Sequence, residues 1–229
     1  MRVQLERVGK AERIHALPVV TLRFESGRVT FGFAETEQRP TVLGLLASGR
    51  MHPDEGQVLI DGEADAAALR RRVALVDAPD VSSPEPNVSV SGVVAEELMF
   101  AGHRATPLAA RQWLEEHGLR EAGRLPMSNL QPAQRVRVLC ELAALRDDVE
   151  GIVLVAPDRH GGDPRVWWDL AAGFAERGYA VLVIAGEAAR LVLNPVLAPT
   201  DAPAPPDVPA TTPTARVGPG ESQTGEGAP

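Results

Sequence analysis

The hydrophobic residues of the chain fall into short runs of two kinds. Nearly continuous apolar runs are typical of strands buried on both faces of a parallel sheet, and they occur at 73–77, 151–156 and 180–185. Earlier runs alternate more with polar residues, which favours antiparallel strands, and they occur at 2–7, 18–24, 28–34 and 57–60. Helices fit the segments between them, at 40–48, 66–71, 89–102, 107–118, 131–146 and 164–177.

Several predicted helices have recognisable ends. Thr106 followed by Pro107 is a favourable helix start, with a capping hydroxyl and a proline in the first turn. Gly118 and Gly178 stand where a helix often ends on a left-handed glycine. Strands that alternate with helices around buried parallel strands predict an α/β core.

Composition changes sharply near the carboxyl end. Residues 195–229 are rich in Pro, Ala, Thr and Gly and contain no aromatic residue. Such a segment cannot bury enough apolar surface to offset its chain entropy. We therefore predict a folded domain over 1–194 and a disordered tail over 195–229.

Charge and cysteine content limit the possible functions. The net charge of −8 argues against a surface for nucleic acid or anionic lipid, since both require basic patches. Cys140 is the only cysteine, which excludes an intramolecular disulfide and favours a buried thiol. No apolar run is long enough to span a membrane, and residues 1–13 lack the apolar stretch of a signal peptide. A cytoplasmic protein is expected.

The order of landmarks over residues 1 to about 190 resembles the ATP-binding cassettes of ABC transporters. The resemblance is carried by TVLGLLASGRMHPDEGQVLIDGE, RRRVALVDAP, MSNLQPAQRVRVLCELAAL, IVLVAPDR, GGDP and GYAVLVIAGE. It implies a RecA-like P-loop NTPase core with a small antiparallel sheet and a helical insert at about 80–127. It also implies a family that binds ATP and Mg²⁺ and works with membrane partners.

The segment that corresponds to the phosphate loop of this family lacks the residues that bind phosphate and Mg²⁺. A loop of the form G-x-x-x-x-G-K-[ST] holds phosphate through backbone N–H groups and a lysine, and holds Mg²⁺ through a hydroxyl. The resemblance places this loop on residues 33–40, where Arg39 replaces the lysine and Pro40 the hydroxyl residue. Only Thr41 keeps the residue type that follows. Arg39 and Thr41 are therefore weak candidates for cofactor binding, and 33–40 also fits a simple turn into a helix.

The other positions of the family have changed as well. The metal-contacting Gln falls on Ala78, and the metal-holding Asp and water-activating Glu fall on Val155 and Ala156. The switch His falls on Gly186. Asp158 is interpreted as a turn residue. The histidines are scattered and none is predicted to lie beside a base or a ligand partner; they occur at 15, 52, 103, 117 and 160.

Three further residues match positions at the dimer interface of the family. Ser128 and Gln131 remain from the signature loop, which has lost its glycines, and Asp163 lies in the loop that crosses the interface. Each has a simpler interpretation: Ser128 fits an N-cap for the helix that begins near 131, and Asp163 fits an N-cap for the helix at 164–177.

These losses predict a fold that is retained without ATPase catalysis, with no bound cofactor expected. The leading hypothesis is a non-catalytic subunit that is peripheral to the inner face of the membrane. Degenerate cassettes of this kind resemble those that accompany YhgE/Pip-type membrane proteins or permeases. An alternative is the degenerate half of an asymmetric cassette dimer, which would contribute Ser128, Gln131 and Asp163 to a composite ATP site. A third is a stand-alone soluble α/β ligand-binding protein.

The predicted docking surface lies on the insert. The segment 88–100 is apolar and amphipathic, and it either packs its own subdomain or contacts a partner. Its consecutive apolar residues cannot all face inward on one helix, so some are expected to be exposed. The candidate docking residues are Val94, Leu98, Met99 and Phe100, with Val93 beside them.

Overall fold

A computed structural model describes residues 1–10, 17–35 and 39–197. Met1–Leu197 form one compact unit, and residues 195–197 of the predicted tail belong to it, with Leu197 packed against the core. The rest of the predicted tail, 198–229, lies outside the described residues, and so do 36–38 of the loop at 33–40.

A small antiparallel sheet forms the amino-terminal part of the unit. Its strand order is β2–β1–β4, with β1 at Arg2–Lys10, β2 at Leu17–Glu25 and β4 at Glu55–Ile60. Val3, Leu5 and Val8 of β1 point into the core, while Arg2, Gln4, Glu6 and Arg7 are more exposed. Alternation along the chain therefore correctly predicted the antiparallel pairing of these three strands.

The second sheet is parallel and has the order β3–β7–β6–β5. Its strands are β3 (Val29–Phe33), β7 (Ala180–Ala185), β6 (Gly151–Val155) and β5 (Val73–Val76). The prediction that the strand at 28–34 is antiparallel was wrong, because β3 pairs in parallel with β7. β3 lies at the edge of the sheet, so its alternating pattern reflects partial exposure and says nothing of strand direction.

The parallel sheet is covered on both faces. One face packs on α5 (Pro132–Ala143), α6 (Pro164–Glu176) and the insert, through Ala74, Val76, Ile152, Leu154, Val181, Val183 and Ala185. The other face packs on α1 (Arg39–Ala47) and the small sheet, through Val73, Leu75, Val153, Val155, Ala180, Leu182 and Ile184. Helix α1 approaches the parallel sheet closely at Gly44, where an added Cβ would lie 2.8 Å from a methyl carbon of Val155 in β6.

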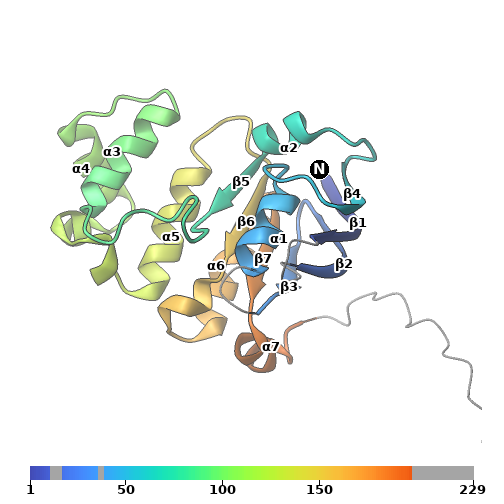
Figure 1. Cartoon of the computed structure of the whole chain (residues 1–229). Helices are drawn as coiled ribbons and strands as arrows, with labels where there is room; N and C mark the ends of the chain where they lie inside the picture. Colours follow the sequence, from blue (N-terminus) through green and yellow to red (C-terminus); the bar gives the residue numbers. More distant parts are fainter. Residues whose placement is uncertain (11–16, 36–38, 198–229) are drawn as a thin grey trace, which may run out of the picture. The chain divides into compact units, whose positions relative to one another are not determined.

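The helical insert lies between β5 and α5. It contains α3 (Val90–Phe100), α4 (Pro107–Glu116), and the short 3-10 helices η1 (Arg120–Arg124) and η2 (Met127–Asn129). Figure 1 shows α3 and α4 beside α5, at the end of the unit remote from β1 and β2. Thr106 caps α4 through its hydroxyl, as predicted, and Gly118 and Gly178 have the positive φ values expected after helix ends.

Three further elements complete the unit. Asp65 caps α2 (Ala66–Arg72), and η3 (Pro157–His160) follows β6. Helix α7 (Glu187–Leu193) follows β7 and was not predicted from the hydrophobic pattern. It is short and its N-cap residue is Gly186, which has no side chain to cap it, so the sequence carries little signal for its start.

Cys140 of α5 is buried and unpaired, as predicted. Burial raises the pKa of its thiol far above the usual value, and the nearby charges of Asp77 and Glu141 raise it further. Among the described residues, no helix combines the length and the hydrophobicity that crossing a membrane requires.

Candidate functional site

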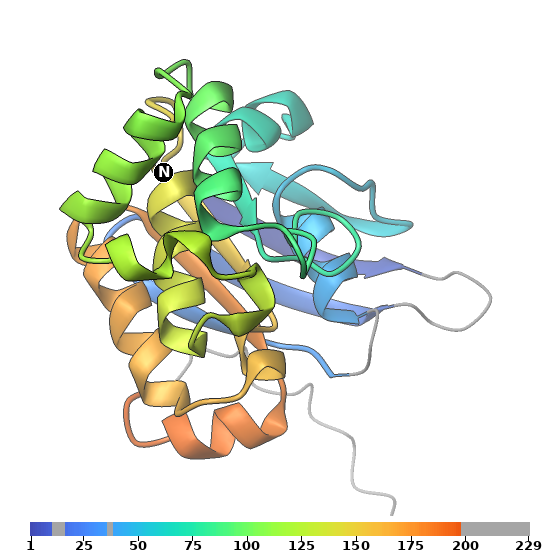
Figure 2. The ribbon, with the colours of Figure 1, turned by 90° about the vertical axis from the view of Figure 1, so that its left-hand side faces the viewer.

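The carboxyl ends of the four parallel strands meet at one edge of the sheet. In open α/β sheets this is the edge at which ligands bind, since loops and helix starts converge there. The segments that leave it begin with Ala34 after β3, Asp77 after β5, Ala156 after β6 and Gly186 after β7. Figure 2 shows the loops that join this edge to the surrounding helices.

The start of α1 carries the remains of the predicted phosphate loop. Arg39 is the first residue of the helix and Thr41 lies in its first turn, and both are partly exposed. Between them Pro40 is buried, and a proline has no N–H group to offer a phosphate. Phe33, at the end of β3, is 49% exposed, and the Arg190 guanidinium lies 5.9 Å from its ring centroid.

Two carboxylates occupy the amino-terminal end of α7. Glu35 Oε1 accepts the N–H of Glu187 at 2.9 Å, and Asp158 Oδ2 accepts the N–H of Gly186 at 3.0 Å. Free N–H groups at a helix start attract anions, and here the side chains of the protein fill that role. These carboxylates also explain the start of α7, because they supply from outside the cap that Gly186 lacks. The predicted turn at Asp158 corresponds to η3.

A buried ion network lies at the ends of β5 and β6. We call it the Asp77 network, and it consists of Asp77, Ser83, Arg135, Arg159 and His160. The side chain of Asp77 is fully buried and that of Arg135 is 5% exposed. Arg135 binds the carboxylate with two donors, Nε to Oδ2 at 3.0 Å and Nη2 to Oδ1 at 2.7 Å. Such a two-point contact fixes both distance and orientation.

The remaining members complete the contacts of the same carboxylate. Arg159 Nη2 lies 2.9 Å from Oδ1, and His160 Nε2 lies 3.0 Å from Oδ2. The Ser83 hydroxyl donates to Oδ1 at 3.0 Å and accepts from both guanidiniums, at 3.1 Å from Arg135 and 3.2 Å from Arg159. Asp77 is therefore a buried charge with several partners on each oxygen.

The electrostatics of the network favour the ionised carboxylate. Burial by itself raises the pKa of Asp77, but hydrogen bonds from His160 and Arg135 and the charges of both arginines outweigh it. The pKa of Asp77 is therefore held well below its usual range. Burial lowers the pKa of Arg159, and the neighbouring Asp77 opposes that effect.

The backbone at this edge has an unusual conformation. Asp77 and Ala156, at the ends of two adjacent strands, have φ values of 58° and 46°, in the left-handed region. Aspartate tolerates this region better than most residues, whereas alanine is strained in it. Arg159 supports the strained segment, because its Nη1 donates to the carbonyls of Val155 and Ala156.

The sequence did not predict the Asp77 network. The prediction that no histidine lies beside a partner was wrong for His160, which contacts Asp77. These residues are 83 positions apart in the chain, and only the pairing of β5 with β6 brings them together. One signal was present: the apolar run at 73–77 ends in an aspartate, which is unusual beside buried strands.

The signature-like residues lie on an exposed surface. Ser128 in η2, Gln131 at the N-cap of α5 and Asp163 at the N-cap of α6 are all exposed. The two loops are close, since a Cβ added at Gly162 would lie 3.2 Å from Cβ of Pro132. Asp163 caps α6 as predicted, through a bond from the N–H of Arg165. The prediction that Ser128 caps α5 was wrong: it lies within η2, and its hydroxyl bonds to Asn129.

The candidate docking residues separate into two groups. Val93, Val94 and Leu98 are buried within the insert and cannot contact a partner, so the assignment of Val94 and Leu98 to a docking surface was wrong. They lie on the inward stripe of α3, which packs on α4 and α5. Met99 and Phe100 are exposed by 56% and 64%, as the length of the apolar run requires.

The residues that the structure describes at this edge do not fit MgATP. Ala78, Val155, Ala156 and Gly186 offer no side-chain ligand for a metal, and the nearby Glu35 and Asp158 carboxylates would repel a polyphosphate. Within the described ranges, no group of three or more His, Cys, Asp or Glu residues is arranged to hold a metal ion.

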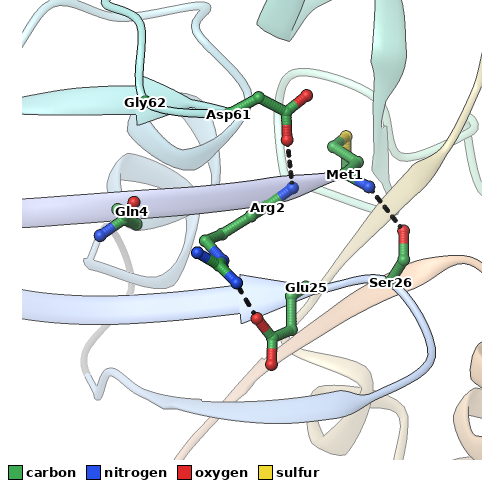
Figure 3. A pocket seen from close by; sticks show the side chains of 7 residues that line it. All are labelled: Met1, Arg2, Gln4, Glu25, Ser26, Asp61 and Gly62. Atoms are coloured by element: carbon green, nitrogen blue, oxygen red, sulfur yellow. Dashed lines mark hydrogen bonds and ion pairs between the residues drawn. The ribbon is translucent and has the colours of Figure 1, made fainter.

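A separate hollow of about 440 Å³ lies in the amino-terminal part of the unit, remote from this edge. We call it the amino-terminal hollow, and it is lined by Met1, Arg2, Gln4, Glu25, Ser26, Asp61 and Gly62. Figure 3 shows Arg2 bound to Glu25 and Asp61, and Met1 bound to Ser26. Glu25 accepts from Arg2, Asp61 accepts the N–H of Arg2, and Ser26 accepts from the Met1 ammonium.

Comparison with solved structures identifies the fold. A crystal structure of a nucleotide-free ATP-binding cassette from an ABC transporter matches 85% of this chain and 85% of its own, with a TM-score of 0.59 and 16% identity. A structure of the ATP-binding subunit of an ABC transporter matches 82% of this chain and 80% of its own, with a TM-score of 0.56 and 14% identity. No protein-family model and no curated protein matches the chain. The chain thus has the α/β fold of an ATP-binding cassette.

Proposed function

We propose that the chain is a non-hydrolysing, cassette-like subunit that binds an integral membrane protein on the cytoplasmic side of the membrane. The observation that carries this proposal is the closed edge of the parallel sheet. There, carboxylates of the chain bind its own guanidiniums and backbone N–H groups, in the place where an ATPase needs open phosphate and metal ligands. The partner is a permease or a protein of the YhgE/Pip type, and no cofactor is required.

The insert supplies the surface for that partner. Met99 and Phe100 at the end of α3 and Leu108 at the start of α4 are exposed apolar side chains, and α3 and α4 pack on each other. Exposed apolar residues that gather on one subdomain are typical of interfaces. Because Val94 and Leu98 are buried, they hold the helix that presents Met99 and Phe100.

The first test is a calorimetric titration of the protein with MgATP. We expect no binding tighter than about 1 mM, or roughly −4 kcal/mol. An Arg39→Ala variant should behave like the wild type. A micromolar dissociation constant that the Arg39→Ala variant loses would contradict the proposal.

The second test is a pull-down from membranes with circular dichroism of each variant. Met99→Glu should abolish partner binding and keep the fold, because Met99 is already exposed. Leu191→Glu is the matched control, since Leu191 is 64% exposed but lies on α7, outside the insert. Arg39→Ala and Thr41→Ala should also keep partner binding. Unfolding of the Met99→Glu variant would remove the local support for docking.

A composite ATP site is the second candidate function. It is supported by the exposure of Ser128, Gln131 and Asp163 on two adjacent loops. An Asp163→Ser variant keeps a capping side chain for α6 and removes the carboxylate. If this variant alone removes ATPase activity from a co-purified complex, the composite site is correct. If no partner co-purifies, a stand-alone ligand-binding protein becomes the better explanation.

A further inference from the structure

The Asp77 network joins parts of the chain that leave and re-enter the sheet. Asp77 ends β5, at the point where the chain departs toward the insert, and Ser83 lies in the departing loop. Arg135 lies in the first turns of α5, where the chain returns from the insert. Its Nη1 also donates to the carbonyl of Met127 in η2 at 3.3 Å. One carboxylate therefore contacts the segments through which the chain enters and leaves the insert.

The same carboxylate is tied to the sheet on its other side. Arg159 and His160 belong to η3, which follows β6 directly. Arg159 contacts Asp77 with one amino group and the carbonyls of Val155 and Ala156 with the other. The network thus runs without a break from the end of β6 through Asp77 to Arg135 and Met127.

Apolar packing also holds the insert, but it acts differently. Val90, Val93 and Leu98 share a core with α5 and the sheet. Contacts of this kind are non-directional, so they resist separation more than rotation. A two-point bond between a guanidinium and a buried carboxylate specifies one orientation. Removing one member leaves the other as an uncompensated buried charge, which is strongly unfavourable.

We infer that the Asp77 network is an internal latch, which fixes the orientation of the insert against the parallel sheet without any bound ligand. The latch rests on the contacts within the chain and not on the proposed function, so the two can fail separately. It makes the presentation of Met99 and Phe100 a constant property of the folded chain.

Hydrogen exchange measured by mass spectrometry on the full chain tests the latch. The variant is Asp77→Asn, because asparagine keeps the size and tolerates the left-handed conformation at this position. Amides of 88–131 should exchange faster, by roughly a hundredfold to several thousandfold, as expected when a buried pair is broken. Amides of β6 and β7 exchange only through global unfolding, so they should accelerate no more than the loss of global stability requires and should remain the slowest to exchange.

A matched control is Glu141→Gln. It weakens an ion pair in which Arg177 Nη1 donates to both oxygens of Glu141; this pair is more exposed than the Asp77–Arg135 pair and joins α5 to the end of α6. This variant should leave exchange in the insert unchanged. Equal acceleration in 88–131 by both variants would overturn the latch, and so would an unchanged pattern in Asp77→Asn.

Milder variants keep the inference testable if Asp77→Asn does not fold. Ser83→Ala and His160→Gln each remove one bond to the carboxylate and leave the Arg135 pair in place. Each should accelerate exchange by a smaller factor, with the fastest exchange in the insert and at the start of α5. Insert and strand amides that exchange at one common rate would show that the insert opens only with the whole fold, and would overturn the latch.

Discussion

The Asp77 network and the amino-terminal hollow both contain arginine–carboxylate pairs, but the pairs are buried in the network and exposed to water in the hollow. Both join arginine to carboxylate, but Asp77 and Arg135 have side chains 0% and 5% exposed, whereas those of Glu25 and Arg2 are 21% and 52% exposed. At the Asp77–Arg135 pair, the bonds replace water that cannot return, so breaking them leaves a buried charge. In the hollow, water can replace either partner. Burial of the charged groups, and not the number of ion pairs, therefore decides which of the two clusters holds the fold in one arrangement.

The largest difference is expected when one carboxylate is neutralised in each place. Asp77→Asn should lower the free energy of unfolding by about 3–5 kcal/mol, since it leaves the Arg135 cation uncompensated in the core. Glu25→Gln should lower it by less than about 1 kcal/mol, since its partners remain hydrated. Urea denaturation of the three proteins measures both values. Similar losses in the two variants would remove the distinction between the regions.

Acid should separate the regions less strongly. A carboxyl with a lowered pKa in the folded state stabilises the protein above its unfolded pKa, and the contribution is lost as the pH falls through the folded pKa. For Asp77, whose pKa is held well below its usual range, the loss begins near pH 4 and continues downward. Below pH 4 the unfolding free energy of the wild type should fall more steeply than that of Asp77→Asn, by at most about 1.4 kcal/mol per pH unit. Parallel curves would show that Asp77 titrates alike in the folded and unfolded states.

Added salt should give the smallest change in stability, but it should act on only one of the two regions. At 1 M ionic strength the screening length is about 3 Å, which weakens exposed pairs and leaves buried ones nearly unchanged. The stability difference between wild type and Glu25→Gln should therefore vanish in 1 M NaCl, while that between wild type and Asp77→Asn persists. Denaturation curves at low and high salt provide the measurement. A difference for Asp77→Asn that also vanishes would mean that water reaches the network.

Local patterns predicted most of the fold, but not its long-range polar contacts. Continuous apolar runs located β5, β6 and β7, because strands buried on both faces leave no place for polar residues. The same pattern gave the wrong strand direction for β3, because this strand lies at the exposed edge of the sheet. No local pattern predicted α7, because its cap comes from the distant residues Glu35 and Asp158.

The sequence predicted which phosphate and metal ligands the candidate site lacks, but not which residues occupy the site. Aligned landmarks located the positions that had lost phosphate and metal ligands, and the structure brings them together at one edge of the sheet. What replaced them stayed hidden, because Asp77, Arg135 and His160 are separated in the chain and meet only through strand pairing. In the segment 88–100, periodicity required some exposed residues but did not identify them, and Met99 and Phe100 are the exposed ones.

The single cysteine, Cys140, can report how often helix α5 opens. Cys140 shares α5 with Arg135, and its buried, protonated thiol is inert while the helix stays packed. A thiol reagent therefore labels the protein only during moments when α5 opens, and the labelling rate counts those openings. No residue has to be introduced, and no second thiol competes for the reagent. The frequency with which α5 opens becomes a quantity that can be timed in the natural sequence.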